Sequence, residues 1–486
     1  MEPMTTAPEW ITRNVSRLRG VRPATDAAPS TATTKPEAER STHERLQATL
    51  RRGSEALTPR ALRRLLADLQ EVVAPRVSEI EGGNRAQAVA TWYAQAEPGE
   101  RRDMWLLMSE QFAPDATRFK SARVRYEAAA GTDEQGQAEI SLRRALVSPR
   151  TRLLQRFSVF PQGMRFLVDL RAELLRALRG DKRLLALDAE LEHLFSTWFD
   201  VAFLELRRLS WDSPASLLEK LIQYEAVHDI RSWADLKNRL DSDRRCYGFF
   251  HPRLPNEPLI FVEVALVDRI SDSITPLLDE AAAPCDISKA TTAIFYSISN
   301  TQTGLRGVSF GDSLIKHVVE TLKQEFPRLR TFATLSPIPG LRSWLGKNAG
   351  AMLERLDERR RAELGRAVGF EPPQASHLLA AFDRAQALDE RSPVRQMLLQ
   401  YAAHYLAREL QDGKPVDPVA RFHLGNGARV ERLNWAGDPS PKGLKQSYGL
   451  MVNYLYDLKR IDKHRAQLAE GQVAASREIE GLCAFR

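Results

Sequence analysis

Hydrophobic and polar positions alternate with two different periods along this 486-residue chain, and the period changes near residue 207. Between residues 43 and 206, large apolar residues recur every three or four positions, as they do on the buried face of an α-helix. The clearest apolar series are Leu62, Leu65, Leu66 and Leu69, and then Phe166, Leu167, Leu170, Leu174, Leu175 and Leu178. A Thr-Pro pair, typical of a helix start, precedes the first of these series. The pattern predicts an all-α helical bundle over residues 43–206.

Short β-branched and aromatic segments characterise the chain after residue 207. They lie at Cys246–Phe250, Leu259–Val267 and Ala293–Ser299, and a proline-rich link joins the first two. Several strands thus precede the first glycine loop, whereas a Rossmann unit would alternate strand and helix from the start. We predict a mixed α/β domain over residues 207–470 and an α+β multidomain chain. Helical periodicity returns between residues 340 and 415, which indicates a helical insertion.

A glycine-punctuated loop, residues 304–311, lies between the strand Ala293–Ser299 and an amphipathic helix. Such a loop directs backbone N–H groups and the helix dipole at one spot, and missing side chains allow close approach. The arrangement predicts an anion site suited to phosphate. A turn that merely caps a helix has the same composition, so the loop alone is a weak signal.

Several separated motifs resemble one family in the right order. They are the segment 293–340, Arg421–Gly427 and Leu433–Trp435, and the similarity continues through residues 245–247, 449–451 and 453–454. Together they resemble malonyl-CoA decarboxylase, whose catalytic domain is a variant of the GNAT acyltransferase fold. The resemblance covers most of residues 207–460. It implies a carboxy-lyase of malonate and fatty acid metabolism that converts malonyl-CoA to acetyl-CoA and CO2 without a metal.

The resemblance also implies which residues carry the reaction. The family's catalytic serine and histidine motifs are intact and map onto Ser336 and His423. Read alone, Ser336 would be a turn residue and His423 a core residue. We expect His423, with a pKa of ~6.5, to protonate the acetyl-CoA enolate, and Ser336 to hydrogen-bond to His423 and to the malonyl carboxylate. Tyr456 and Asn434 are lesser candidates for the acyl pocket.

His423 precedes an Asn426-Gly427 pair, a strong hairpin signal, so we expect it on the incoming strand of a hairpin. The CoA loop of GNAT enzymes reads Gln/Arg-x-x-Gly-x-Gly/Ala, and this chain fits it except that Ser309 stands at the first required glycine. By resemblance, the CoA-binding residues are Arg306, Gly307, Val308, Ser309, Phe310, Gly311 and Asp312.

Composition narrows the functional classes further. The chain has 70 basic and 63 acidic residues and a net charge of +7, which suits an anionic ligand but forms no nucleic-acid stripe. Its three cysteines include no CxxC pair, so neither a disulfide framework nor a zinc site is indicated. No apolar run approaches the ~20 residues that span a bilayer. We expect a cytoplasmic protein, bacterial in origin, that binds no nucleic acid, membrane, metal or separate cofactor.

The ends of the chain carry little chemistry. Residues 20–42 are rich in Pro, Thr, Ala and Ser, which predicts a disordered leader over residues 1–42. A transit peptide is less favoured there because Glu2 and Glu9 interrupt the basic pattern. Residues 471–486 are expected to form a C-terminal tail. By resemblance, the helical domain holds a homo-oligomer together, either a dimer or a tetramer.

Two other functions stay open. One is a GNAT-type acyltransferase that moves an acyl group from CoA to an amine, although neither an acceptor channel nor a base for the amine is identifiable. The other is a non-catalytic CoA-ester sensor, against which the intact Ser336 and His423 argue. Release of CO2 from malonyl-CoA without an acceptor separates the decarboxylase from both.

Overall fold

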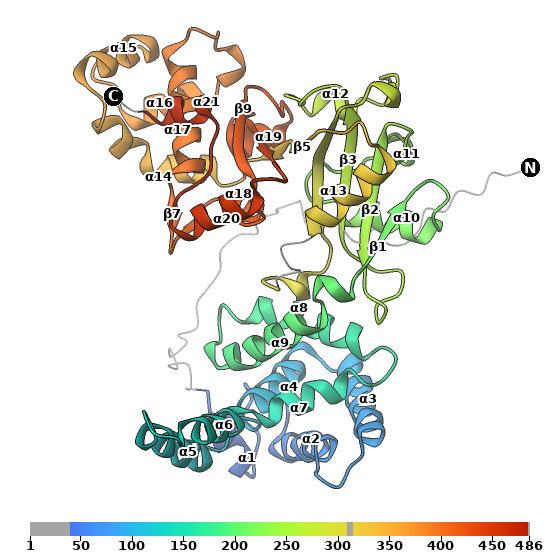
Figure 1. The fold of residues 1–486 in the computed structure, drawn as a ribbon. Coiled ribbons are helices and arrows are strands. Elements are labelled where there is room, and N and C mark those ends of the chain that lie inside the picture. Colours follow the sequence, from blue (N-terminus) through green and yellow to red (C-terminus); the bar gives the residue numbers. More distant parts are fainter. Residues whose placement is uncertain (1–38, 309–313, 485–486) are drawn as a thin grey trace, which may run out of the picture.

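A computed structural model describes residues 39–308 and 314–484 of the chain. Most of the predicted leader lies outside these residues, as do Ser309, Phe310, Gly311 and Asp312 of the predicted CoA loop. Figure 1 shows two parts: a helical domain, residues 42–198, and a sheet domain that begins at residue 205. The predicted succession of an all-α region and a mixed α/β region is confirmed. Within the described residues, no helix is both long and apolar enough to cross a membrane.

Nine α-helices form the described part of the helical domain. They are α1 (Thr42–Gln47), α2 (Pro59–Val72), α3 (Glu79–Gln95), α4 (Pro98–Glu110), α5 (Ala116–Ala128), α6 (Gln135–Leu146), α7 (Pro149–Phe157), α8 (Gly163–Ala177) and α9 (Leu185–Trp198). Thr58 caps α2 by accepting a hydrogen bond from the N–H of Ala61, as its Thr-Pro signal predicts. The apolar faces meet in a core that buries Leu69, Leu107, Leu154, Phe157, Leu167, Leu170 and Leu174 completely.

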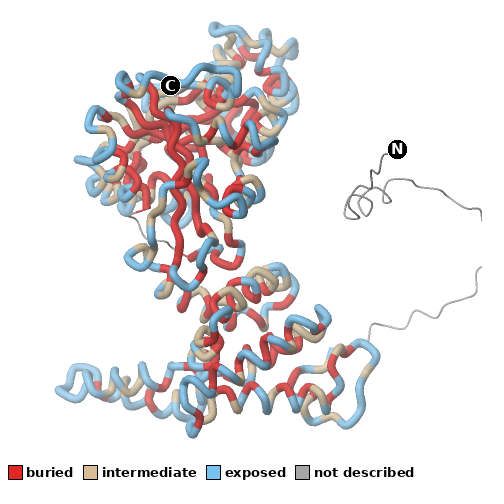
Figure 2. The backbone as a smooth tube through the Cα atoms, turned by 90° about the vertical axis from the view of Figure 1, so that its right-hand side faces the viewer, coloured by how far each residue is buried: buried red, intermediate tan, exposed pale blue. Residues whose placement is uncertain are grey.

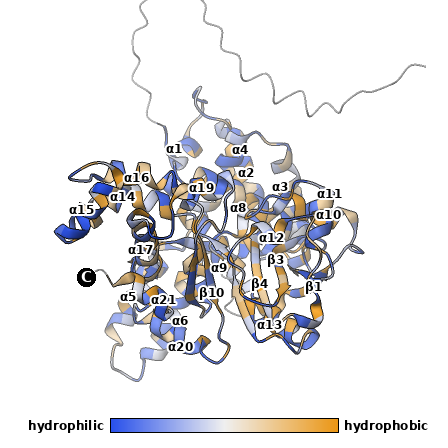
Figure 3. Cartoon of the chain, turned by 90° about the horizontal axis from the view of Figure 1, so that it is seen from above, coloured by the Kyte–Doolittle hydropathy of each residue, from blue (hydrophilic) through white to orange (hydrophobic). Residues whose placement is uncertain are grey.

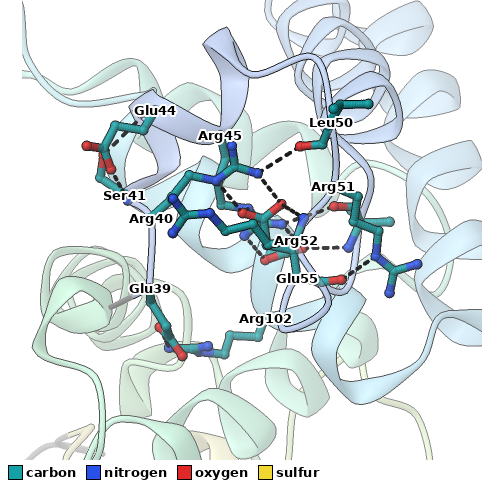
Figure 4. A network of polar contacts seen from close by, with 12 residues as sticks. Glu39, Arg40, Ser41, Glu44, Arg45, Leu50, Arg51, Arg52, Glu55 and Arg102 are labelled. Carbon is teal, nitrogen blue, oxygen red and sulfur yellow. Dashed lines mark hydrogen bonds and ion pairs between the residues drawn. The ribbon is translucent and has the colours of Figure 1, made fainter. Parts of the chain in front are cut away.

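The start of this domain is fixed by arginine–carboxylate pairs. Figure 4 shows the guanidinium of Arg40 against Glu55, with Nε–Oε1 and Nη2–Oε2 distances of 2.7 and 2.8 Å. The same guanidinium donates to the carbonyl oxygen of Leu50 at 2.9 Å. Arg45 makes a second two-pronged pair with Asp103 on α4. Bidentate pairs of this kind hold side chains in one geometry, so they attach the α1 segment to the bundle.

The sheet domain is built on one mixed sheet whose strands occur in the order β1-β2-β3-β4-β5-β10-β6, with β9 paired to β10. Its strands are β1 (Glu205–Leu209), β2 (Arg244–Phe250), β3 (Pro258–Val267), β4 (Thr292–Asn300), β5 (Thr331–Thr334), β6 (Ser336–Pro337), β9 (Arg429–Asn434) and β10 (Met451–Leu455). β2 and β3 are buried along their whole length. In Figure 2 the strands at the centre of the sheet domain are coloured as buried. In Figure 3 the strands β3 and β4 are largely hydrophobic.

The sheet opens at its middle. β1 to β4 are antiparallel, whereas β4 and β5 are parallel and pair only from Thr292–Phe295 to Thr331–Thr334. β4 then continues to Asn300, while the chain after β5 continues into β6, which pairs with β10 instead. Ser336 is the first residue of β6. The two halves of the sheet therefore diverge where Ser336 lies.

Helices cover the sheet and form the predicted insertion. Those around the sheet are α10 (Ala215–Tyr224), α11 (Trp233–Arg239), α12 (Thr275–Leu278), α13 (Leu314–Glu325), α18 (Pro418–Gly425), α19 (Pro441–Ser447), α20 (Ile461–Ala469) and α21 (Arg477–Cys483). The insertion follows β6 and holds α14 (Leu341–Glu354), α15 (Glu358–Val368), α16 (Ala375–Phe382) and α17 (Pro393–Ala407), then a small pair, β7 (Leu410–Gln411) and β8 (Lys414–Pro415). Short 3-10 turns occur at residues 182–184, 201–203, 287–289, 303–305 and 385–387.

The segment predicted to be a C-terminal tail packs onto the sheet domain. Ala475 forms a bridge with Val430 of β9, and the N–H of Ser476 donates to the carbonyl oxygen of Val430 at 2.9 Å. Ile479 of α21 is completely buried. This contact explains why a polar, helix-prone segment is ordered: it adds to the edge of β9 and covers it.

The predicted hairpin at Asn426-Gly427 is wrong, because His423 lies on helix α18 and not on a strand. Asp417 caps this helix by accepting hydrogen bonds from the N–H groups of Val419 and Ala420, and Pro418 occupies its first position. Gly427 has a φ of +83°, which ends the helix and turns the chain into β9. The Asn-Gly pair is therefore a helix C-terminus, and Asp417-Pro418 is the start signal that the hairpin interpretation overlooked.

Candidate active site

Ser336 and His423 are brought together although 87 residues separate them. The start of β6 positions Ser336 and the last turn of α18 positions His423, and the distance from Ser336 Oγ to His423 Nε2 is 3.3 Å. Their exposed fractions are 5% and 4%. The expected contact between the two side chains is thus present, in a place from which most water is excluded.

Tyr456 contacts the other side of the imidazole. Its hydroxyl lies 2.8 Å from Nδ1 of His423, and burial raises the pKa of this phenol. Tyr456 follows β10, whose last residue is Leu455. We expected Tyr456 only as a lesser candidate for the acyl pocket, but the structure puts it in direct contact with His423. No local motif marks this contact, which depends on α18 packing beside the end of β10.

The hydrogen bonds around His423 indicate which of its two ring nitrogens carries the proton. The hydroxyl of Ser336 donates to Oγ1 of Thr334 at 2.8 Å, and Thr334 also accepts the N–H of Tyr454 at 3.1 Å. If Tyr456 donates to Nδ1, the Nε2–H of His423 donates to Ser336. The protons of Tyr456, His423 and Ser336 then each have an acceptor, whereas the opposite tautomer leaves the Tyr456 proton without one among the described residues. The network therefore favours His423 protonated at Nε2.

Burial makes His423 neutral. It lowers the pKa of the imidazole to about 3, because the described residues place no carboxylate there to compensate for the lost solvation. The rings of Tyr454 and Phe422 lie 4.8 and 5.0 Å from that of His423. The expectation that His423 keeps an ordinary pKa near 6.5 is therefore wrong for this state of the site: at neutral pH the ring carries no charge.

Asn434 supports the site from a distance. Its Nδ2 donates to Oδ1 of Asn453 at 2.9 Å, and the side chain of Asn453 donates to the carbonyl oxygen of Thr334 at 2.7 Å. Arg432 donates to Oδ1 of Asn434 at 2.9 Å. Asn434 therefore orients Asn453, which holds the strand that carries Thr334, and Asn434 itself hydrogen-bonds to neither Ser336 nor His423.

A pocket of about 730 Å³ lies between the glycine loop and α18. Its volume falls in the range of small-molecule sites. Arg306, Gly307 and Val308 line one side, and Phe422, the neighbour of His423, lines the other. These are the described members of the predicted CoA loop, and Gly307 has a φ of +85°, which favours glycine.

Two further basic residues, Lys414 and Arg421, line the same pocket and are exposed. Together with Arg306 they give it three cationic side chains suited to phosphate groups. Sequence reasoning missed both. Arg421 stands two positions before His423 and could have been noticed within that motif, whereas Lys414 follows the helical insertion with no local signal.

The described residues contain no group of three or more His, Cys, Asp or Glu side chains placed to hold a metal ion. Cys246, Cys285 and Cys483 are free thiols, and burial raises the pKa of each. None of them contacts Ser336 or His423. At the pair itself, the described residues supply the hydroxyl groups of Ser336 and Tyr456 and the imidazole of His423.

Two family models match the chain. The model of the malonyl-CoA decarboxylase C-terminal domain matches residues 202–485, and that of the malonyl-CoA decarboxylase N-terminal domain matches residues 112–199. Ser336, His423 and the glycine loop all lie within the first of these matches.

Named relatives agree with these matches. Over 417 residues the chain is 36% identical to the mitochondrial malonyl-CoA decarboxylase of Anser anser anser, covering 81% of this chain and 82% of that one. The crystal structure of malonyl-CoA decarboxylase from Rhodopseudomonas palustris is similar with a TM-score of 0.75 and 42% identity, covering 86% of this chain and 99% of that one. For the enzyme from Agrobacterium vitis, the TM-score is 0.76 and the identity 40%, with the same coverage.

Proposed function

Because the chain belongs to the malonyl-CoA decarboxylase family, we propose that its Ser336–His423 site converts malonyl-CoA to acetyl-CoA and CO2. The observation that carries this proposal is the buried contact between the two side chains, at the opening of the sheet and beside the pocket of the glycine loop. The experiment is incubation of the protein with malonyl-CoA alone. Release of CO2 without an acceptor supports the proposal. Turnover only in the presence of an amine would identify an acyltransferase instead.

The pocket binds the CoA part of the substrate. Arg306, Lys414 and Arg421 meet the phosphates, and the backbone of the glycine loop adds N–H donors. The pantetheine arm then enters the opening between β4 and β6, which leads the malonyl thioester to Ser336. Beyond Phe295, β4 pairs with no described strand on the side that faces β6. Its backbone N–H and C=O groups there can bond to the amides of the pantetheine arm, which supports this route for the substrate.

The bond between C2 and the carboxylate breaks first. Its electron pair delocalises into the thioester carbonyl as an enolate, and CO2 leaves. Burial of Ser336 and His423 favours this step, because a carboxylate that is poorly solvated gains by becoming neutral CO2. Ser336 orients the carboxylate by turning its hydroxyl from Thr334 toward it.

The proton for C2 comes from His423. An arriving malonyl carboxylate favours the charged imidazolium, so its binding raises the pKa of His423 and draws one proton from solvent. In the charged ring both nitrogens donate, so Tyr456 changes from donor to acceptor at Nδ1. After CO2 departs, the imidazolium gives its proton to C2, directly or through Ser336. One proton is consumed in each turnover, as the reaction requires.

Homo-oligomeric assembly belongs to the same proposal, with α5 and α6 as its contact surface. Figure 1 shows this helical hairpin at the end of the helical domain that is farther from the sheet. Its apolar side chains Val124, Ile140, Leu146 and Val147 are 57, 44, 50 and 64% exposed. A second copy would cover these side chains. A cytoplasmic location and independence from a metal or separate cofactor complete the proposal.

A further inference from the structure

Residues 304–307 of the glycine loop pack against the helical domain, although they belong to the sheet domain. The turn at residues 303–305 lies on α8, and a Cβ atom at Gly304 would be only 1.9 Å from the carbonyl oxygen of Val168. Only glycine permits so close an approach. Figure 1 shows α8 and α9 on the side of the helical domain that faces the sheet. The helical domain is therefore in a position to set the shape of the loop.

Arg171 on α8 makes the central contact between the two domains. Its Nη1 donates to the carbonyl oxygens of Gly304 and Arg306, at 2.9 and 2.8 Å. The side chain of Arg171 is only 1% exposed. A buried guanidinium that donates to two carbonyls of a neighbouring domain fixes the orientation of both peptide groups.

Two carboxylates of α9 compensate for the buried charge. Asp188 accepts from Nε of Arg171 at 2.8 Å, and Glu192 accepts from Nη2 at 3.0 Å. A Cβ atom at Gly307 would be 3.5 Å from Glu192. Without Arg171, the charge of Glu192 would stand uncompensated beside the loop and repel an anionic ligand.

The carbonyl contacts determine where the loop's N–H groups point. In a planar trans peptide the C=O and the following N–H point in opposite directions. The carbonyl oxygen of Arg306 faces Arg171, so the N–H of Gly307 faces away from α8. This N–H has no hydrogen-bond partner among the described residues, while Gly307 lines the pocket. It is therefore available to a ligand there.

A second arginine of α8 holds the same segment. Arg165 donates from Nη1 to Oε1 of Gln302 at 2.7 Å and is itself paired with Asp169 on the next turn. Gln302 is 6% exposed. Two cationic side chains from one helix thus fix the loop at both ends of the turn.

We propose that Arg171 is a positioning residue through which the helical domain holds residues 304–307 of the glycine loop in the conformation that binds the phosphates of the CoA ester. The inference rests on the proposed function, because it assigns the loop's ligand. It gives the helical domain a role in substrate binding that is independent of subunit assembly.

The test is Arg171→Lys, which keeps the charge but cannot reach two carbonyls and two carboxylates at once. We expect KM for malonyl-CoA to rise about tenfold or more and kcat to change less than about threefold. Malonyl-pantetheine, which lacks the nucleotide phosphates, should be decarboxylated with an unchanged kcat/KM. The dissociation constant for CoA, measured by titration, should rise with KM.

Arg150→Lys is the matched control. Arg150 is likewise buried in the helical domain and donates to the carbonyl oxygens of Met108 and Ala186, at 3.0 and 3.2 Å. It should lower Tm as Arg171→Lys does and leave KM unchanged. If Arg171→Lys does not fold, Arg165→Met replaces it, with an expected rise in KM of about threefold, since one weaker contact is lost.

Three results would overturn the inference: an unchanged affinity for CoA in folded Arg171→Lys, an equal rise in KM in Arg150→Lys, or an equal loss with malonyl-pantetheine. The CoA titration needs no turnover. Wild-type protein that binds CoA but releases no CO2 from malonyl-CoA would therefore count against the proposed function, while the titration of the variants would still decide the role of Arg171.

Discussion

The two ends of the proposed substrate path differ in charge and in access to water. At the pocket, Arg306, Lys414 and Arg421 are exposed cations, and Arg171 holds the loop from beneath. At the Ser336–His423 pair, the side chains are buried and His423 is neutral. The difference separates two tasks. Exposed cationic side chains suit a phosphate ester, whereas a buried site that solvates a carboxylate poorly favours its loss as CO2.

The largest effect is expected at the buried end. His423→Asn and Ser336→Ala should each lower kcat by about 10²–10⁴, the range for a positioned acid–base group. The double variant should resemble the worse single one, because the two side chains act as one unit. Steady-state CO2 release measures all three. Additive losses would mean that Ser336 and His423 act independently, and a near wild-type rate for His423→Asn across pH 6–9 would assign the proton to another group.

The exposed end should respond through KM. Gly307→Val places a β-branched residue at a φ of +85° and should raise KM for malonyl-CoA far more than it lowers kcat, since binding is lost in ground and transition states alike. Gly131→Val is the matched control: its φ is +75°, in the turn between α5 and α6. A KM that is unchanged in folded Gly307→Val would remove the loop from the phosphate site.

The sequence predicted the local features of the site better than the contacts between distant segments. Glycine loops and strand–helix junctions are local, so their composition is visible along the chain. Tyr456 and Thr334 meet the pair only through the packing of α18 and the pairing of β10, which no short segment encodes. The Asn426-Gly427 pair led to a wrong hairpin prediction because the same dipeptide suits both a hairpin turn and a helix end. The helix-start signal Asp417-Pro418 distinguishes the two. Arg171 lies 133 residues from Gly304 and was likewise invisible.

The burial of His423 should also make the free energy of unfolding depend on pH, which is a smaller effect. His423 has a pKa of about 3 when folded and ~6.5 when unfolded, so the unfolded state binds the extra proton and stability is lost as pH falls below 6.5. Between pH 8 and pH 5, wild-type protein should lose about 2 kcal/mol more free energy of unfolding than His423→Asn. Urea unfolding at the two pH values measures the difference. Burial also lowers the pKa of His228, to about 4. Because His228 is present in both proteins, its contribution cancels in the comparison.

The smallest effect on catalysis is expected from the α5–α6 hairpin, which lies at neither end of the path. Changing both Val124 and Ile140 to Glu should lower the subunit number seen by light scattering, because charges are poorly tolerated in a buried interface. Per-subunit kcat should change less than about twofold. The control is Phe370→Glu, an exposed apolar residue of the insertion. A subunit number that stays the same in the hairpin variant would move the interface elsewhere.

Proton uptake on substrate binding reports the charge of His423 itself. We propose that His423 is neutral in the free site and becomes charged when the malonyl carboxylate arrives. A non-decarboxylating malonyl-CoA analogue should be mixed with the protein at pH 7 in weakly buffered indicator solution, with acetyl-CoA as the control that lacks the carboxylate. We expect uptake of about one proton per site with the analogue, none with acetyl-CoA and none in His423→Asn. Binding of the analogue by wild-type protein without proton uptake would contradict it.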